Sequence, residues 1–245
     1  MHRFFAERID SDTARLLPQE ARHALTVLRL KPGENIQLIL EDQLFHAVLA
    51  AVEPEVTAKL GDPLPSPEPG TRVTVYQGLP KADKVDWLAQ KCTEAGAYAV
   101  RVMEMARSVS RLSGKDADKK AERWQRIAQE AAKQSGRAHV PAVEVIQPRK
   151  LAGLLAEHEL MLVPWEEAHA LSLGEAVRAH PEAKDIAVVI GPEGGITPEE
   201  IETLRASGAV PVTLGPRIFR TETAGLAALI MLLYERGEYG AREGN

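Results

Sequence analysis

The sequence predicts an α/β protein with a mostly parallel sheet, preceded by a small module rich in strands. From residue 73 onward, short apolar runs alternate with longer helix-forming runs. Such alternation is typical of a parallel sheet with helices on both faces. Before residue 61 the pattern differs, and residues 61–70 carry alternate prolines that hold the chain extended. We therefore expect a first domain over residues 1–66, a semi-rigid linker over residues 61–70, and a second domain over residues 70–245.

The N-terminal module is expected to contain one helix and at least two strands. Residues 18–28 have a helical pattern, and residues 36–40 and 44–52 have strand patterns separated by a short turn. About 60 residues enclose only a marginal core. A partly open barrel is the architecture that this pattern favours.

The second domain is expected to alternate strands with helices. The helical segments include residues 84–94, 119–134 and 224–235. A further helix is predicted after Thr197, with Thr197 as N-cap, Pro198 at the first position, Glu200 closing a capping box, and Gly208 ending it. The predicted strands are residues 73–77, 98–103, 143–146, 160–163, 186–190 and 210–214.

Charge is distributed unevenly along the chain. The net charge is −5 over 245 residues, yet residues 101–150 contain twelve Lys or Arg and six Asp or Glu. This local excess of +6 indicates a footprint for nucleic acid. A solvated helix face with internal ion pairs explains the same pattern, so both interpretations stay open.

Composition narrows the class of protein. Cys92 is the only cysteine, which excludes an internal disulfide and favours a reducing compartment, the cytoplasm. No stretch approaches about 18 unbroken apolar residues, so neither a signal peptide nor a membrane span is expected. The seven histidines form no recognisable ligand pair, and no metal is predicted.

Two glycine-containing loops near the C-terminus predict a ligand site. Gly191-Pro192-Glu193-Gly194-Gly195 follows one predicted strand, and Gly215-Pro216-Arg217-Ile218-Phe219-Arg220 follows another. Ligands of open α/β sheets bind outside the carboxyl ends of strands. The first loop matches neither the dinucleotide fingerprint nor a phosphate loop, and it suits an adenine edge or a ribose. A tight turn that merely needs glycine is the alternative.

The second loop leads into a helix that is apolar on nearly every side, over residues 224–235. Such a helix is either buried or shared with a partner subunit. Arg217 and Arg220 precede it and need an anionic partner, which is either Glu222 or a bound substrate.

These segments together resemble the ribosomal RNA small subunit methyltransferase E family of the SPOUT superfamily. The resemblance runs nearly end to end and is carried by residues 3–5, 23–29, 78–81, 90–96, 107–108, 133–137, 191–195 and 214–224. It implies methylation of N3 of one uridine in 16S rRNA, with S-adenosylmethionine as methyl donor. It also implies a C-terminal α/β domain with a deep trefoil knot, an N-terminal PUA-like β-barrel for RNA, and a homodimer.

The resemblance implies which loops hold the cofactor, and the chemistry of the reaction suggests roles for charged residues near them. The implied cofactor-binding residues lie on three loops: Val163, Pro164, Gly191, Glu193, Gly194, Leu214, Gly215, Ile218, Phe219, Arg220 and Thr223. Arg220 is the expected stabiliser of the deprotonated uracil, and Glu222 the candidate proton acceptor. An ion pair of Glu222 with Arg217 or Arg220 at the helix start is the structural alternative. The expected RNA contacts are Arg3, Arg29, Arg107, Lys133 and Arg137.

Two other functions stay open at this point. One is a knotted methyltransferase that acts on tRNA or on a ribose 2′-hydroxyl, since its loops are similar. The other is a catalytically silent RNA-binding protein of ribosome assembly, which the intact cofactor loops disfavour.

Overall fold

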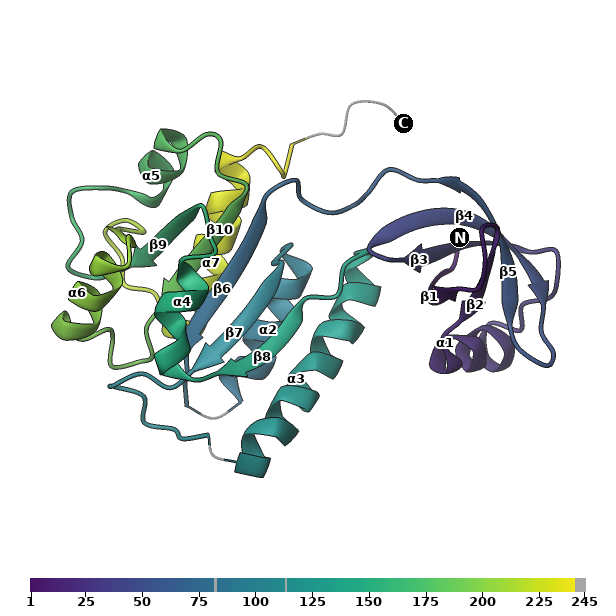
Figure 1. Cartoon of the computed structure of the whole chain (residues 1–245), viewed down its shortest axis with the longest axis horizontal. Helices are drawn as coiled ribbons and strands as arrows, with labels where there is room; N and C mark the ends of the chain where they lie inside the picture. The colour runs from purple at the N-terminus through teal and green to yellow at the C-terminus, as the bar shows by residue number, and fades with distance from the viewer. Residues whose placement is uncertain (82, 113, 241–245) are drawn as a thin grey trace. The chain divides into compact units, whose positions relative to one another are not determined.

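The computed structural model describes residues 1–81, 83–112 and 114–240 of the chain. It divides into two compact units (Figure 1). The first unit comprises Met1–Glu68 and Ala132–Val140, and the second comprises Pro69–Ala131 and the chain from Pro141 onward. The helix that begins at Gly114 therefore contributes its last turn to the first unit.

The first unit is a closed five-stranded β-barrel with the strand order β1-β2-β5-β4-β3. Its interior is filled by apolar side chains such as Phe4, Ile36, Leu38 and Leu49. A short helix α1 and a π-helical turn η1 follow β2. The bounds are β1 Arg3–Arg8, β2 Thr13–Leu16, α1 Pro18–Arg22, η1 His23–Val27, β3 Asn35–Leu40, β4 Gln43–Ala51 and β5 Thr57–Pro63.

Two expectations for this unit are corrected. The barrel is closed rather than partly open, because β1 pairs in parallel with β3 and antiparallel with β2. β1 has charged residues at both ends and β2 is only four residues long, so the apolar pattern did not reveal them. The predicted linker also begins too early, since Gly61 to Pro63 form the end of β5. Pro63 is tolerated there because it pairs with Phe45 beside an irregularity in the register of β4 and β5.

The second unit contains a six-stranded sheet with the strand order β11-β9-β10-β6-β7-β8. Every pairing in it is parallel, as the alternation of strands and helices predicts. The bounds are β6 Arg72–Gly78, β7 Ala99–Met103, β8 Ala142–Ile146, β9 Leu160–Pro164, β10 Asp185–Ile190 and β11 Val210–Val212. β11 ends two residues before the predicted strand end, and Thr213 forms only an isolated bridge with Ser172.

Helices cover both faces of this sheet (Figure 1). One core contains Leu88, Trp124 and Leu229 from three helices, and the opposite core contains Leu155 and Ile201 from two others. The bounds are α2 Lys84–Glu94, α3 Gly114–Ser135, η2 Pro148–Lys150, α4 Leu151–Leu155, α5 Leu173–Ala179, α6 Pro198–Ala206 and α7 Thr221–Glu235.

Helix α6 begins as its local sequence predicts. Thr197 accepts a hydrogen bond from the N–H of Glu200, and the Glu200 carboxylate accepts one from the N–H of Thr197. The helix ends before Gly208, whose φ of +88° is the left-handed conformation expected after a helix C-terminus. No helix of the described residues is long and apolar enough to cross a membrane.

Candidate cofactor site at the carboxyl ends of three strands

The three loops that follow β9, β10 and β11 lie together at the carboxyl edge of the sheet. They enclose two adjacent cavities, of about 340 and 470 Å³. The cavities share a wall formed by Pro164, Glu166, Ile218, Phe219 and Ala224. Both loops predicted from the glycine pattern therefore contribute to one site.

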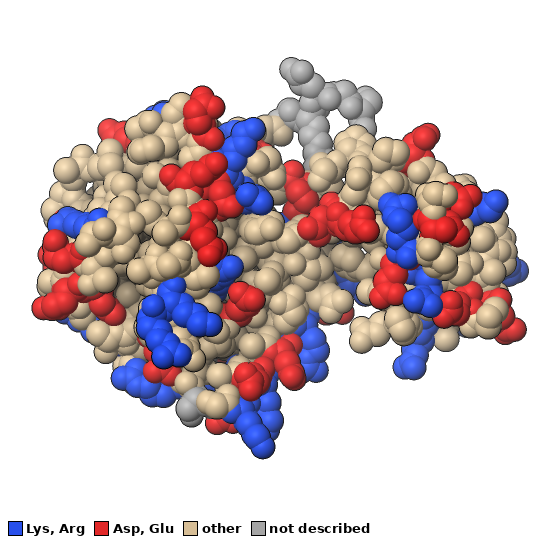
Figure 2. Space-filling view, in the orientation of Figure 1, with Lys and Arg blue, Asp and Glu red and all other residues tan. Residues whose placement is uncertain are grey.

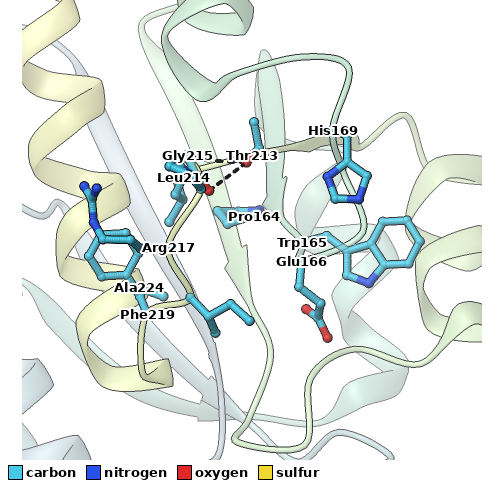
Figure 3. A pocket seen from close by; sticks show the side chains of 12 residues that line it. Pro164, Trp165, Glu166, His169, Thr213, Leu214, Gly215, Arg217, Phe219 and Ala224 are labelled. Atoms are coloured by element: carbon cyan, nitrogen blue, oxygen red, sulfur yellow. Dashed lines mark hydrogen bonds between the residues drawn. The ribbon is translucent and has the colours of Figure 1, made fainter.

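The smaller cavity is lined by aromatic and aliphatic side chains together with the polar Glu166, His169 and Arg217. Figure 3 shows Trp165, Glu166 and His169 on one side of it and Leu214 and Phe219 on the other. The turn after β11 is closed by the Thr213 hydroxyl, which accepts a hydrogen bond from the N–H of Gly215 at 3.1 Å. This cavity suits a flat, weakly polar group that backbone atoms can recognise.

Buried polar side chains hold the β10 loop against the start of α7. Gln77 Nε2 donates to Thr221 Oγ1 at 2.7 Å, and that hydroxyl donates to the Gly191 carbonyl at 2.5 Å. Gln77 is fully buried and Thr221 is nearly so. Because β6, β10 and α7 all contribute to this chain of hydrogen bonds, the loop has a defined position before any ligand binds.

Arg107 and Glu200 hold the other end of the same loop. Arg107 Nη1 donates to the Gly194 carbonyl at 2.9 Å. The Glu200 carboxylate accepts from the N–H of Ala106 at 2.9 Å as well as from Thr197. The segment after β7 is therefore attached to the loop after β10 through two hydrogen-bonding side chains.

Lys84, at the start of α2, lies between carboxylates of two elements. Its ammonium group is 2.8 Å from Glu193 and 3.2 Å from Glu222. The hydrogen bond to Glu193 is the main cause that raises the pKa of Lys84. Burial tends to raise the pKa of Glu193, but hydrogen bonds from Lys84 and from the N–H of Lys81 lower it below its usual value.

This lysine corrects one expectation about Glu222. The structure pairs Glu222 with Lys84, where the sequence suggested Arg217 or Arg220. The packing of α2 against α7 brings Lys84 there. Sequence spacing carries no signal for this contact, because Lys84 begins α2 and Glu222 lies in α7, the last helix of the described chain.

Most of the residues predicted to bind cofactor line the two cavities. They are Pro164, Gly191, Glu193, Gly194, Leu214, Gly215, Ile218, Phe219 and Arg220. Val163 instead packs in the core on the far side of β9, and Thr223 lies within the first turn of α7. Within the described chain, Arg220 makes no side-chain hydrogen bond or ion pair. Trp165, Glu166 and His169 also line the site, and the sequence pattern did not single them out.

Three of the residues expected to contact RNA have partners inside the first unit. Lys133 pairs at 2.5 Å with Glu20, which is only 3% exposed. Arg137 is nearly buried and pairs with Glu68 at 2.5 Å. Arg3 hydrogen-bonds to Gln37 and to the carbonyl of Gly136. These three side chains stabilise the contact between the barrel and residues 132–140, which include the last turn of α3.

The other two expected RNA contacts, Arg29 and Arg107, are exposed. Arg29 has a φ of +55°, in the left-handed region, at the end of the turn that follows η1. Among the described residues, no group of three or more His, Cys, Asp or Glu side chains is arranged to hold a metal ion.

Comparisons with known proteins agree with this architecture. Residues 66–233 match the family described as RNA methyltransferase domain, and residues 16–60 match the family described as RNA methyltransferase PUA domain. The chain is 35% identical to a ribosomal RNA small subunit methyltransferase E of Bacillus subtilis, over 96% of this chain and 97% of that protein. The chain belongs to the ribosomal RNA small subunit methyltransferase E family. The resemblance carried by its motifs is thereby confirmed.

Solved structures agree with this membership. A ribosomal RNA small subunit methyltransferase E from Neisseria gonorrhoeae, bound to S-adenosyl methionine, is 32% identical with a TM-score of 0.77. The match covers 94% of this chain and 95% of that one. A putative methyltransferase from Legionella pneumophila, in complex with the same cofactor, is 27% identical with a TM-score of 0.75, over 95% and 96% of the two chains. The expectation of a PUA-like barrel followed by an α/β methyltransferase domain is confirmed.

Proposed function

We propose that this protein methylates N3 of a specific uridine in 16S rRNA, with S-adenosylmethionine as methyl donor. One observation carries the proposal. The loops that follow β9, β10 and β11 enclose two adjacent cavities, and nine of the predicted cofactor-binding residues line them. Family membership and the cofactor-bound relative support the same reaction.

The residues present fit this cofactor. The smaller cavity is lined by Trp165 and Leu214, which suit an adenine ring. The larger one is lined by Lys84, Glu193 and Arg220, which suit a charged amino-acid end. The bound sulfonium supplies an electrophilic methyl group. The protein then has to orient the uracil and stabilise its charge, because an in-line displacement needs little covalent help.

Arg220 and Glu222 are the residues to which we assign the chemistry. The Arg220 guanidinium is available on the wall of the larger cavity, where it stabilises the negative charge of a uracil that loses its N3 proton. Glu222 is mostly buried, at 14% side-chain exposure, and is the proposed proton acceptor. Lys84 keeps this carboxylate near the cavity, and its ion pair replaces the arginine contact suggested by the sequence.

For RNA we assign the exposed Arg29 and Arg107 and the basic segment that begins α3. Figure 2 shows Lys and Arg side chains gathered near the start of α3 and the loop before it, among acidic ones. Arg111, Lys115 and Lys119 are exposed there. Such a mixed but net positive segment suits phosphate contacts. Arg3, Lys133 and Arg137 serve the barrel unit instead.

We further infer a homodimer formed through α7, in the cytoplasm. Ile230, Met231 and Tyr234 are 40%, 37% and 70% exposed on this helix. Exposed apolar side chains on one helix favour an interface between subunits. We also propose that the two domains divide at residues 66–70 and that the second domain contains a trefoil knot.

Methylation of defined RNAs tests the function. Purified protein is incubated with S-adenosylmethionine and either deproteinised 16S rRNA or undermethylated 30S particles, and the product nucleotide is mapped by mass spectrometry. We expect a single N3-methyluridine in 16S rRNA. Methylation of a ribose or of tRNA would support the alternative knotted methyltransferase, and binding of 30S particles without methylation would support a silent assembly factor.

A further inference from the structure

Glu166 occupies the junction of the two cavities. It follows β9 on the third loop of the site, and among the lining residues it is the one acidic side chain common to both cavities. Figure 3 shows its carboxylate in the space between the loop that carries Trp165 and the loop that carries Phe219. A ligand that extends through both cavities therefore passes this carboxylate.

The carboxylate of Glu166 is free for a ligand. The other acidic side chain of the cavity walls, Glu193, is already paired with Lys84 at 2.8 Å. Glu166 makes no side-chain hydrogen bond or ion pair with any residue that the structure describes. It remains an acceptor of up to four hydrogen bonds.

Gly195 admits this side chain to the site. A Cβ atom at residue 195 would lie 2.6 Å from Glu166 Oε1, and the φ of Gly195 is +75°. Any side chain there would displace the carboxylate and strain the backbone. The glycine of the β10 loop thus provides space for a residue of the β9 loop.

The order of the cavities indicates which part of the ligand Glu166 meets. Both cavities have mixed polar and apolar walls, but Trp165 and Leu214 line only the smaller one and suit the adenine ring. Lys84, Glu193 and Arg220 line only the larger one and suit the charged amino-acid end. In S-adenosylmethionine the ribose connects these two parts, and the acidic side chain lies where the two cavities meet. Carboxylates are common partners of ribose hydroxyls in nucleotide sites.

We propose that Glu166 accepts hydrogen bonds from the ribose hydroxyls of S-adenosylmethionine and so positions the methyl donor, an assignment that rests on the proposed function. Two hydrogen bonds to a charged acceptor orient the sugar about its bonds to both ends. The cofactor is thereby aligned across the wall that Phe219 and Ile218 provide.

Calorimetry with matched variants tests this assignment. Glu166→Gln is compared with wild type and with Glu167→Gln, since Glu167 is the neighbouring exposed glutamate that lines neither cavity. The probes are S-adenosylhomocysteine, its 2′-deoxy derivative, and 5′-methylthioadenosine, which keeps the ribose but lacks the amino acid. We expect Glu166→Gln to weaken S-adenosylhomocysteine and 5′-methylthioadenosine equally, by about tenfold. It should also reduce the preference of the wild type for the ribose over the 2′-deoxyribose.

Several outcomes would overturn the assignment. Unchanged affinities in Glu166→Gln would do so, as would an equal loss in Glu167→Gln. A loss for S-adenosylhomocysteine without a loss for 5′-methylthioadenosine would place the carboxylate on the amino group instead of the ribose. Failure of the wild type to bind S-adenosylhomocysteine at all would refute the proposed function itself, and the two failures are thus distinguishable. Unfolding midpoints of the three proteins show whether each variant is folded.

Discussion

Substitution of Gly194 by valine tests whether the β10 loop forms the cofactor site. A Cβ atom at residue 194 would lie 2.8 Å from Cβ and 3.2 Å from the carbonyl oxygen of Arg107. Neither atom is the end of a flexible side chain, so the backbone of one of the two loops must move. The φ of Gly194 is not in the left-handed region, and the perturbation is therefore purely steric.

The expected magnitude follows from that contact. Forcing extra carbon atoms into a packed position costs about 1–3 kcal/mol. A shift of the loop would also disturb the hydrogen bond from Arg107 to the Gly194 carbonyl. If the cost falls on the ligand-bound arrangement of the loop, the dissociation constant rises about 5- to 150-fold.

Isothermal titration calorimetry with S-adenosylhomocysteine measures this change. Gly153→Val is the matched control, because nothing lies within 4 Å of a Cβ at residue 153 and that residue lines neither cavity. We expect the control to bind like wild type. A Gly194→Val protein that is folded and binds within twofold of wild type would refute the assignment of this loop to the cofactor.

Three further predictions concern charged residues. Arg220→Ala should lower kcat at least about 100-fold, because the substitution removes a stabiliser of transition-state charge, while the dissociation constant for S-adenosylhomocysteine changes little. Single-turnover methylation measures this rate, and an unchanged kcat would exclude the proposed role of Arg220. Lys84→Met should weaken cofactor binding and lower kcat, and Lys84→Arg should restore both. The control Lys91→Met removes a comparable exposed ion pair from the same helix and should have no effect. Equal effects of the two methionine variants would contradict the placement of Lys84. Burial tends to raise the pKa of Glu68, but Arg137 and two backbone N–H groups hold it below its usual value of 4.5. The stabilisation is therefore complete above about pH 4.5 and is lost as the pH falls through the lower pKa of the folded state. Glu68→Gln should lower the unfolding free energy at pH 7 by about 3 kcal/mol or more and flatten its decline below pH 4.5. Urea unfolding at a series of pH values measures both effects. If the unfolding free energy of the variant fell with decreasing pH as steeply as that of the wild type, this account would be contradicted.

The elements that the sequence predicted well are those specified by neighbouring residues. The bounds of α2 were predicted residue for residue, since its apolar spacing and the following Gly96 are local signals. The capping box of α6 and the apolar run of β10 are local in the same sense. The short strands β1 and β2 carry no such signal, because their stability comes from pairing with β3 and β5.

The same difference between local and tertiary signals separates the candidate site residues that were predicted from those that were not. The glycine loops were recognised because a break after a buried strand is visible in the sequence. The partners of charged residues were not, and Lys133 and Arg137 proved to neutralise Glu20 and Glu68 within the barrel unit. The sequence shows which residues carry a positive charge, but only the fold shows which carboxylate lies beside each of them.

The sequence by itself determined the α/β class, the parallel sheet and the two loops that end β10 and β11, because these depend on the periodicity and conformational preferences of adjacent residues. The tertiary structure decided which side chains meet at those loops. It placed Lys84 between Glu193 and Glu222, and Glu166 against Gly195. These contacts join residues from separate strands and helices, and packing of those elements, rather than any local pattern, sets the distances between them.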